Sequence, residues 1–265
     1  LTKIANAMVA LDWVQATGAD LGQLAVVPGS AAAIGGPNQM GLRPGDRISL
    51  RDALYCAIIG SDNWAAETIA LHVGRDLLRR SGGRGTPVGK FVEEMNNLSA
   101  KLGAEGTKFT NPHGMDHQRP VPHSTAADIA RLTIYAMGKP AFTFYCSQKE
   151  RKVTVHTATG EREFLVKNTN RLLGVDGIDG VKTGMTAKAG GCLVISADKK
   201  SLVTETPDGR TRVTPRRLVV VVLGASDRFE ASQSLLARGW QKFEAWNSTG
   251  RIIRDETEVL RMPKE

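Results

Sequence analysis

The spacing of the hydrophobic residues changes near residue 150, and this change constrains the fold more than any other feature of the sequence. Before it, apolar residues recur every three to four positions, as in amphipathic helices, beginning with Ile4, Met8 and Leu11. After it, segments such as RKVTVHT alternate apolar and polar residues, which is typical of strands with one buried face. Helices followed by strands predict an α+β architecture, because helices and strands alternate along the chain in folds with a parallel sheet.

Capping residues and glycines suggest where the helices begin and end. We expect four helices after the first one: SLRDALYCAIIG from Ser49 to Gly60, NWAAETIALHVG ending at Gly74, KFVEEMNNLSAKLG, and STAADIARLTIYAMG from Ser124 or Thr125 to Gly138. Residues 81–89, SGGRGTPVG, have the composition of a flexible loop.

The second part predicts an antiparallel sheet. RKVTVHT and REFLVKN, joined by ATGE, form a hairpin in this prediction, and GIDGVKTG, GGCLVISA and RRLVVVVLG follow as strands. ASQSLLARGWQKFEAW is a closing helix and RIIRDETEVLRM a last strand. We therefore expect one domain over residues 1–265, with a helical subregion at about 1–147 and a sheet subregion at about 148–265.

The charge of the chain is compatible with several anionic partners. Its 35 Lys and Arg exceed its 27 Asp and Glu, for a formal net charge of +8. The basic residues are scattered, with the densest group at residues 210–217, and aromatic residues make up only 5% of the chain. This composition argues against nucleic-acid binding, which uses aromatic side chains as stacking platforms. Peripheral membrane contact stays open.

Three short stretches carry groups suited to catalysis. GSDN places Ser61 and Asn63 in the link between two predicted helices, and VKTGMT places Lys182, Thr183 and Gly184 at a strand end, where the glycine permits close approach of a substrate. The first helix has no capping residue, and its first turn carries a lysine, Lys3, where the helix dipole disfavours a cation.

A serine directly before Leu1 would give Lys3 a catalytic role. It would complete the pattern S-L-T-K, in which residues three apart share one helix face. A desolvated lysine near a second lysine has a lowered pKa and can act as a neutral base. Ser196 and Lys199 show the same spacing, but on a strand their side chains point to opposite faces.

The order of S-x-x-K, S-x-N and K-T-G resembles that of penicillin-binding proteins and class A β-lactamases. Together with NPHGMD, DGIDGVKTGMTAKAGGCLV and RFEASQSLLARGW, it makes the sequence similar to the serine-type D-alanyl-D-alanine carboxypeptidases, or low-molecular-mass penicillin-binding proteins, over nearly its whole length. The resemblance implies a β-lactamase/DD-peptidase-like fold, with a five-stranded antiparallel sheet flanked by helices. Members of this family carry two strands before the nucleophile helix, and that region and the nucleophile are missing from this sequence.

The resemblance also implies a role for each motif residue. The serine expected before Leu1 is the nucleophile, Lys3 takes its proton, and Ser61 relays a proton toward the leaving group. Asn63 donates its amide to the substrate's peptide carbonyl.

The remaining motif residues bind substrate in this scheme. Lys182 and Thr183, beside Gly184, hold the terminal carboxylate, and Arg228 adds a second charge. The backbone N–H of Met185 completes the oxyanion hole.

The expected enzyme removes the terminal D-alanine from peptidoglycan stem peptides, is inhibited by β-lactams and works in the bacterial periplasm or outside the cell. We expect no cofactor and no metal. His113 lies among turn-forming residues, and His117 and His123 lack the spacing of metal ligands. The cysteines also lack such a spacing and have apolar neighbours: Cys56, Cys146 and Cys192. One alternative is a class A-like β-lactamase, for which Glu93 and Asn97 have the required spacing but lie in a helix as surface residues. The other is a peptidoglycan-binding paralogue without the nucleophile.

Overall fold

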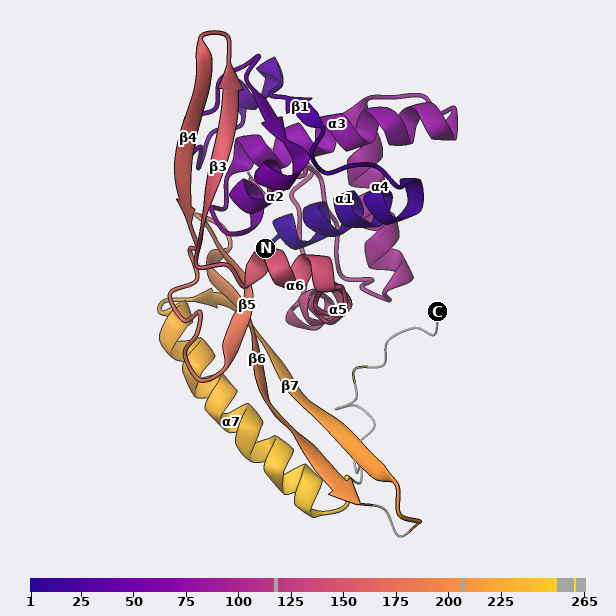
Figure 1. Cartoon of the computed structure of the whole chain (residues 1–265), viewed down its shortest axis with the longest axis vertical. Coiled ribbons are helices and arrows are strands. Elements are labelled where there is room, and N and C mark those ends of the chain that lie inside the picture. The colour runs from indigo at the N-terminus through magenta and orange to yellow at the C-terminus, as the bar shows by residue number, and fades with distance from the viewer. Residues whose placement is uncertain (117–118, 206–207, 252–259, 261–265) are drawn as a thin grey trace.

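A computed structural model describes residues 1–116, 119–205, 208–251 and 260, and divides into two parts that meet at the start of the first helix (Figure 1). One part holds most of the helices and a small sheet, and the other holds a long twisted sheet with a helix along one face. This arrangement confirms the predicted α+β class.

The first part is built around a buried central helix, α1. Six helices and one short 3-10 turn lie in this region: α1 (Lys3–Thr17), η1 (Gly29–Ala33), α2 (Leu50–Ile58), α3 (Asn63–Ser81), α4 (Pro87–Lys101), α5 (Ala126–Met137) and α6 (Pro140–Cys146). Every residue of α1 from Lys3 to Leu11 is buried, so this helix is enclosed and not amphipathic as predicted. Alanines at positions 5, 7 and 10 allow its neighbours to approach it from several sides.

Three predicted helix ends are confirmed, among them Gly138 at the end of α5, and one is wrong. The Ser49 hydroxyl accepts from Asp52 N at 3.0 Å at the start of α2, and Thr125 caps α5 in the same way. Gly74 does not end α3, which continues to Ser81. A Cβ atom at Gly74 would lie 2.1 Å from the carbonyl oxygen of Pro87 in α4. This glycine therefore serves close contact between two helices.

The expected loop at residues 81–89 is shorter than predicted. Gly82 ends α3 in a left-handed conformation, and the Thr86 hydroxyl caps α4 by accepting from Gly89 N. Pro87 occupies the first turn of α4, where its missing N–H costs nothing. Only residues 82–86 connect the two helices.

Among the described residues, seven strands form two antiparallel sheets. The first sheet has the order β1 (Leu24–Val26), β2 (Arg47–Ser49), β3 (Glu150–Thr157) and β4 (Gly160–Lys167). The second has the order β5 (Ile178–Thr186), β6 (Gly190–Glu205) and β7 (Thr211–Ala225). The predicted hairpin of β3 and β4 is confirmed, but it pairs with β2 and so joins the sheet of the helical part.

The sheet that carries K-T-G has three strands among the described residues, where five were expected. The last strand predicted for RIIRDETEVLRM falls almost entirely outside the described residues.

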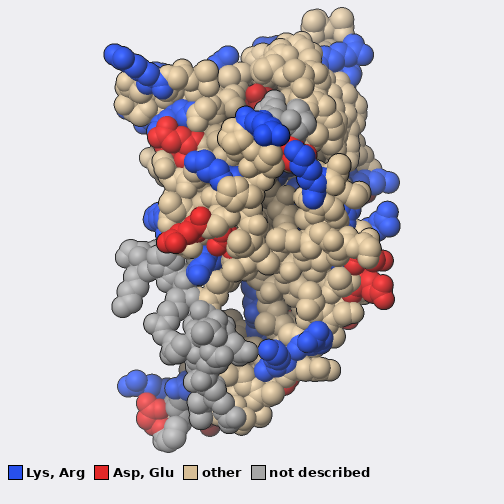
Figure 2. Space-filling view, turned by 180° about the vertical axis from the view of Figure 1, so that it is seen from behind, with Lys and Arg blue, Asp and Glu red and all other residues tan. Residues whose placement is uncertain are grey.

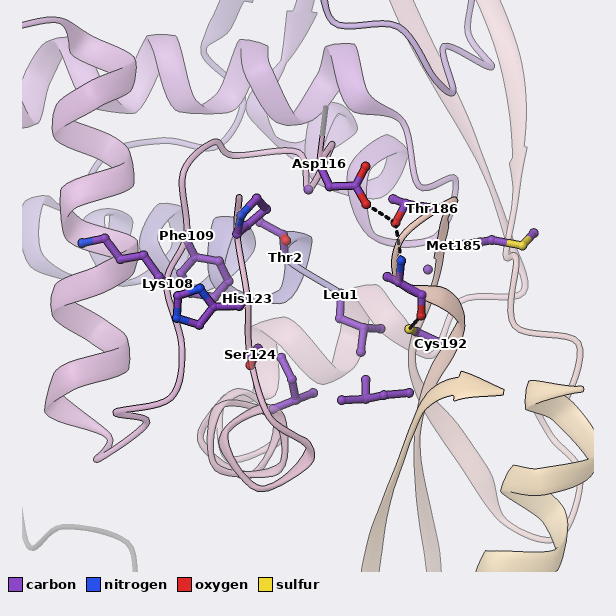
Figure 3. A pocket seen from close by; sticks show the side chains of 16 residues that line it. Leu1, Thr2, Lys108, Phe109, Asp116, His123, Ser124, Met185, Thr186 and Cys192 are labelled. Carbon is purple, nitrogen blue, oxygen red and sulfur yellow. Dashed lines mark hydrogen bonds between the residues drawn. The ribbon is translucent and has the colours of Figure 1, made fainter. Parts of the chain in front are cut away.

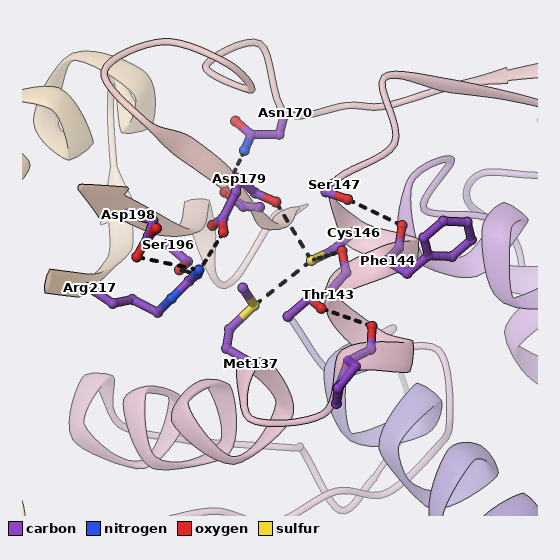
Figure 4. A network of polar contacts seen from close by, with 12 residues as sticks. Met137, Thr143, Phe144, Cys146, Ser147, Asn170, Asp179, Ser196, Asp198 and Arg217 are labelled. Atoms are coloured by element: carbon purple, nitrogen blue, oxygen red, sulfur yellow. Dashed lines mark hydrogen bonds and ion pairs between the residues drawn. The ribbon is translucent and has the colours of Figure 1, made fainter. Parts of the chain in front are cut away.

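The helix α7 (Arg228–Ser248) covers one face of the second sheet, as the sequence predicted for ASQSLLARGWQKFEAW (Figure 1). It buries Leu236 and Trp240 against Leu193, Ile195 and Ala197 of β6. Ser196 and Lys199 of β6 point apart. Ser196 accepts a hydrogen bond from Arg217 at 2.7 Å (Figure 4), whereas Lys199 lies over the Trp240 ring of α7.

Three further features of the fold are the state of the cysteines, the distribution of surface charge and the character of the helices. All three cysteines are buried and unpaired, in agreement with their predicted role as small core residues. Lys and Arg are spread over the face seen in Figure 2 and are interspersed with Asp and Glu. Within the described chain, no helix combines the length and apolar character needed to cross a membrane.

Candidate active site

The three motifs meet at one cleft between the two parts of the molecule. Its cavity of about 70 Å³ is lined by Lys3, Ser61, Asn63, Lys182, Thr183, Gly184 and Met185, together with Leu1 and residues of the 113–115 loop. The start of α1, the link between α2 and α3, and strand β5 contribute these residues. Segments more than 180 positions apart in the chain, such as those of Leu1 and Met185, therefore meet at this cleft.

Lys3 is buried in the cleft and is held there by two hydrogen bonds. Its side chain is 6% exposed, and its Nζ donates to Asn63 Oδ1 at 2.6 Å and to the His113 carbonyl at 2.8 Å. Burial lowers the pKa of Lys3 to about 8, although the nearby Asp62 carboxylate opposes this shift. A substantial fraction of neutral amine is therefore available close to physiological pH.

The S-D-N link is held in a strained conformation. Ser61 has a φ of +58°, in the left-handed region that non-glycine residues rarely adopt. Asp62 caps α3 by accepting from Ala65 N at 2.9 Å, so Asn63 is the first residue of that helix. Asn63 is oriented from both ends, because its Oδ1 accepts from Lys3 while its Nδ2 donates to the Gly35 carbonyl at 3.1 Å.

Strand β5 forms the opposite wall. Lys182 is 2% exposed, and its Nζ donates to the Thr183 carbonyl at 3.0 Å. Burial lowers its pKa well below the ordinary value, and the charges of Lys3 and Arg228 add to this effect. A Cβ at Gly184 would lie 3.1 Å from the Leu1 nitrogen, so this glycine accommodates the backbone of α1 as well as leaving room for a ligand.

Arg228 lies at the edge of this arrangement. Its Nη1 donates to the Gly184 carbonyl at 2.7 Å, and its side chain is not among those lining the cavity. Its charge nevertheless acts on Lys182. Met185 is 72% exposed, so its side chain points away while its backbone stays at the cleft (Figure 3).

Several supporting residues come from the segment between α4 and α5, and no sequence motif had indicated their contacts with the cleft. Asn111 accepts from Gly114 N and donates to the Met115 carbonyl, both at 2.7 Å. These bonds confirm the predicted turn and aim the His113 carbonyl at Lys3. Asp116 and Thr186 point toward one another and are hydrogen-bonded at 2.5 Å, which ties this loop to β5 (Figure 3).

A second, mostly apolar cavity of about 330 Å³ adjoins the cleft (Figure 3). Its walls include Leu1 and Thr2, which precede α1, together with Phe109 of the loop and Cys192 of β6. The Lys108 side chain points away from it (Figure 3).

In the part of the chain that the structure describes, histidines and acidic residues do not gather into a metal site. Within the described ranges, no group of three or more His, Cys, Asp or Glu side chains is placed to hold a metal ion. His113 Nδ1 accepts from Met115 N at 3.2 Å, His123 pairs its backbone with Lys108, and His117 lies outside the described residues. Glu93 and Asn97 are exposed on α4, as predicted, and Glu93 forms an ion pair with Lys90.

Comparison with known proteins agrees with this geometry. A model of the D-alanyl-D-alanine carboxypeptidase family, Peptidase_S11, matches residues 1–206, which is most of the chain. The chain belongs to this family. The match includes the Lys3, S-D-N and K-T-G residues of the cleft and covers all of β6.

Individual relatives support the same assignment. The chain is 35% identical over 214 residues to the D-alanyl-D-alanine carboxypeptidase DacD of Escherichia coli, covering 78% of this chain and 46% of the relative. It is 33% identical over 254 residues to DacC of the same organism, covering 92% of this chain and 55% of the relative. The chain thus spans about half the length of these curated relatives.

Solved structures of similar proteins share the fold. The Streptomyces K15 DD-transpeptidase superposes with a TM-score of 0.71 at 25% identity, covering 91% of this chain and 86% of that one. Penicillin-binding protein D2 of Listeria monocytogenes, solved in its ampicillin-bound form, has a TM-score of 0.67 at 24% identity, covering 90% and 85% of the two chains. The penicillin-binding fold is therefore shared by this chain.

Proposed function

We propose that the full-length protein hydrolyses the terminal D-Ala-D-Ala bond of peptidoglycan stem peptides through a serine acyl-enzyme. The observation that carries this proposal is the convergence of Lys3, Ser61, Asn63, Lys182 and Thr183 on one cleft in a member of this family. Each of these groups has a chemical task in acyl transfer that matches its position.

The nucleophile in this proposal is a serine immediately preceding Leu1, and Lys3 is its general base. Residues three apart on a helix share one face, so this serine would lie beside the Lys3 amine. The Leu1 nitrogen is already against Gly184, which would bring the serine to the K-T-G strand. Two acceptors, Asn63 Oδ1 and the His113 carbonyl, hold the Lys3 amine in place.

Ser61 and Asn63 act on the scissile amide. Ser61 carries a proton toward the departing nitrogen, between Lys3 and Lys182. Asn63 has a second amide hydrogen beyond the one given to Gly35, and it donates this hydrogen to the substrate's peptide carbonyl. The bond from Lys3 to Asn63 Oδ1 keeps the amide in the orientation that this requires.

Strand β5 recognises the end of the substrate. Lys182 and Thr183 attract the terminal carboxylate, with Arg228 supplying additional positive charge from behind Gly184. The backbone N–H of Met185 and that of the nucleophile form the oxyanion hole. A carboxylate next to the scissile amide is the feature that distinguishes a D-Ala-D-Ala terminus from an internal peptide bond.

The reaction proceeds in two steps. The serine oxygen bonds to the carbonyl carbon of the penultimate D-alanine, its proton passes to Lys3, and the terminal D-alanine leaves with a proton delivered through Ser61. Water then attacks the ester, which releases the shortened peptide and restores the serine. A β-lactam would acylate the same serine and would remain bound.

The proposed site of action is the bacterial periplasm or another extracytoplasmic compartment, where peptidoglycan is found, and the role is in cell-wall maturation and cell shape. The curated relatives are named as D-alanyl-D-alanine carboxypeptidases. The β-lactamase alternative has less support, since Glu93 and Asn97 are exposed on α4 and do not line the cleft.

The deciding experiment treats the full-length gene product with a fluorescent penicillin and maps the labelled peptide. We expect label on the serine before Leu1 and release of D-alanine from a pentapeptide ending in D-Ala-D-Ala. Replacing that serine by alanine should abolish both, while Ser196→Ala, which removes the other serine with S-x-x-K spacing, should keep them. A correctly folded, full-length protein that takes up no label would favour a peptidoglycan-binding role instead.

A further inference from the structure

The turn between β4 and β5 brings a hydroxyl group to the K-T-G strand that neither the motifs nor the family match singles out. Thr169, in the stretch Asn168–Thr169–Asn170, has its Oγ1 2.7 Å from Thr183 Oγ1. Its backbone N–H donates to the Ile59 carbonyl at 3.0 Å, two residues before Ser61. One residue therefore contacts both the strand that binds the substrate carboxylate in the proposed mechanism and the segment leading into S-D-N.

The two asparagines fix this turn. Asn168 Nδ2 donates to the carbonyls of Cys146 at 3.1 Å and Gln148 at 2.9 Å, at the end of α6. Asn170 Nδ2 donates to the Gly180 carbonyl of β5 at 2.9 Å (Figure 4). Asn168 Oδ1 also accepts from Asn170 N at 2.9 Å. Thr169 is thus held between two anchored residues, so its hydroxyl stays at the strand.

The hydroxyl pair has a preferred direction when an anion is bound. Each hydroxyl offers one hydrogen and can accept two hydrogen bonds. If Thr183 donates to Thr169, it has no hydrogen left for a carboxylate. If Thr169 donates to Thr183, the Thr183 hydrogen is free for the anion, and the two bonds in series reinforce one another.

We infer that Thr169 is a positioning residue that turns the Thr183 hydroxyl toward the carboxylate of the substrate, and so contributes to selectivity for a free C-terminus. This inference rests on the proposed carboxypeptidase function. Thr169 does not line the cleft and acts only through Thr183.

The test compares two peptides that differ only at their last group, one ending in D-Ala-D-Ala with a free carboxylate and one with a C-terminal carboxamide. In the full-length enzyme, Thr169→Val should lower kcat/KM for the free acid by about 5- to 10-fold, the effect of one lost hydrogen bond near a charged ligand. The value for the carboxamide should change by less than about 2-fold, since a neutral amide end gains little from that donor. Thr169→Ser should restore the preference because it keeps the hydroxyl.

Two further variants separate this effect from loss of structure. Thr133→Val removes a buried hydroxyl that donates to the Ile129 carbonyl in α5. Thr133 does not line the cleft, so this variant should leave the preference intact. Thr169→Ala keeps the backbone bond to Ile59 and should behave as Thr169→Val does, which replaces that variant if it fails to fold.

The outcomes distinguish the two proposals. An active wild-type enzyme whose Thr169 variants lose both substrates equally, or keep their full preference for the free acid, overturns the role of Thr169 alone. A wild-type protein that neither binds penicillin nor hydrolyses the acid peptide overturns the proposed function and this inference with it.

Discussion

The pH dependence of acylation tests the assignment of Lys3 as a neutral base. With a pKa of about 8, roughly one-tenth of Lys3 is neutral at pH 7 and about nine-tenths at pH 9. The rate constant for acylation by penicillin should therefore rise about 10-fold between these values and then level off. A lysine with the ordinary pKa of 10.5 would instead give a rise of about 100-fold with no plateau below pH 10.

The assay is the second-order rate constant for labelling by a fluorescent penicillin, measured from pH 6 to pH 10 on the full-length enzyme. Lys90→Met, which changes a lysine ion-paired on the surface of α4, should not alter the profile. A rate that is independent of pH, or that keeps rising to pH 10, would refute the assignment of Lys3 as a base whose pKa is lowered by burial.

Asp62 provides a second, directional test of the same reasoning. Its carboxylate opposes the lowering of the Lys3 pKa, so Asp62→Asn should move the rise in rate to lower pH. Asparagine is as good a helix cap as aspartate, which preserves the start of α3. A profile that shifts to higher pH, or does not shift, would contradict the proposed coupling between these two side chains.

Three further substitutions test the surrounding structure. Gly74→Ala should lower the free energy of unfolding by about 1–3 kcal/mol in denaturant melts, because overpacking against the Pro87 carbonyl outweighs the better helix propensity of alanine; increased stability would contradict this. Lys182→Met should raise the free energy of unfolding at pH 7 by about 0.5–2 kcal/mol while weakening hydrolysis of peptides with a free carboxylate, since the native state holds a buried amine whose pKa is lowered. The Lys182 amine binds its proton less readily in the native state than in the unfolded chain. The difference in the free energy of unfolding between Lys182→Met and wild type should therefore shrink as pH rises toward the ordinary lysine pKa. A difference that does not change with pH would contradict this explanation. Asn111→Ala should cost about 1–3 kcal/mol in thermal or chemical unfolding and slow penicillin labelling, because it releases the loop whose His113 carbonyl holds Lys3; unchanged labelling would show that the loop does not position the base.

The local features of this protein were predictable from the order of its residues. Capping side chains and hydrophobic period act over a few positions, so Ser49, Thr125 and the β3–β4 hairpin could be read from short windows. The motif residues could be named for the same reason, because Ser61, Asn63 and Lys182 follow in a fixed order on recognisable elements.

Short windows of sequence could not reveal which distant segments of the chain contact one another. Gly74 has the local signature of a helix end, yet contact with Pro87 of α4 explains its presence within α3. The β3–β4 hairpin has the same alternation as β5 to β7, and only its pairing with β2 assigns it to the other sheet.

The sequence by itself determined the types of the longer elements, the three motifs and the family to which they belong, because each depends on residue identity over a short stretch, whereas α6, β1 and β2 were not predicted. Only the tertiary structure decided which groups hold the residues of the proposed site: the His113 carbonyl contacts Lys3, and the Thr169 hydroxyl contacts Thr183. A backbone carbonyl has no sequence signature, and a threonine in a turn resembles any other until the fold brings its partner within 2.7 Å. Hydrogen bonds act over such distances alone, so their partners are set by packing and not by position along the chain.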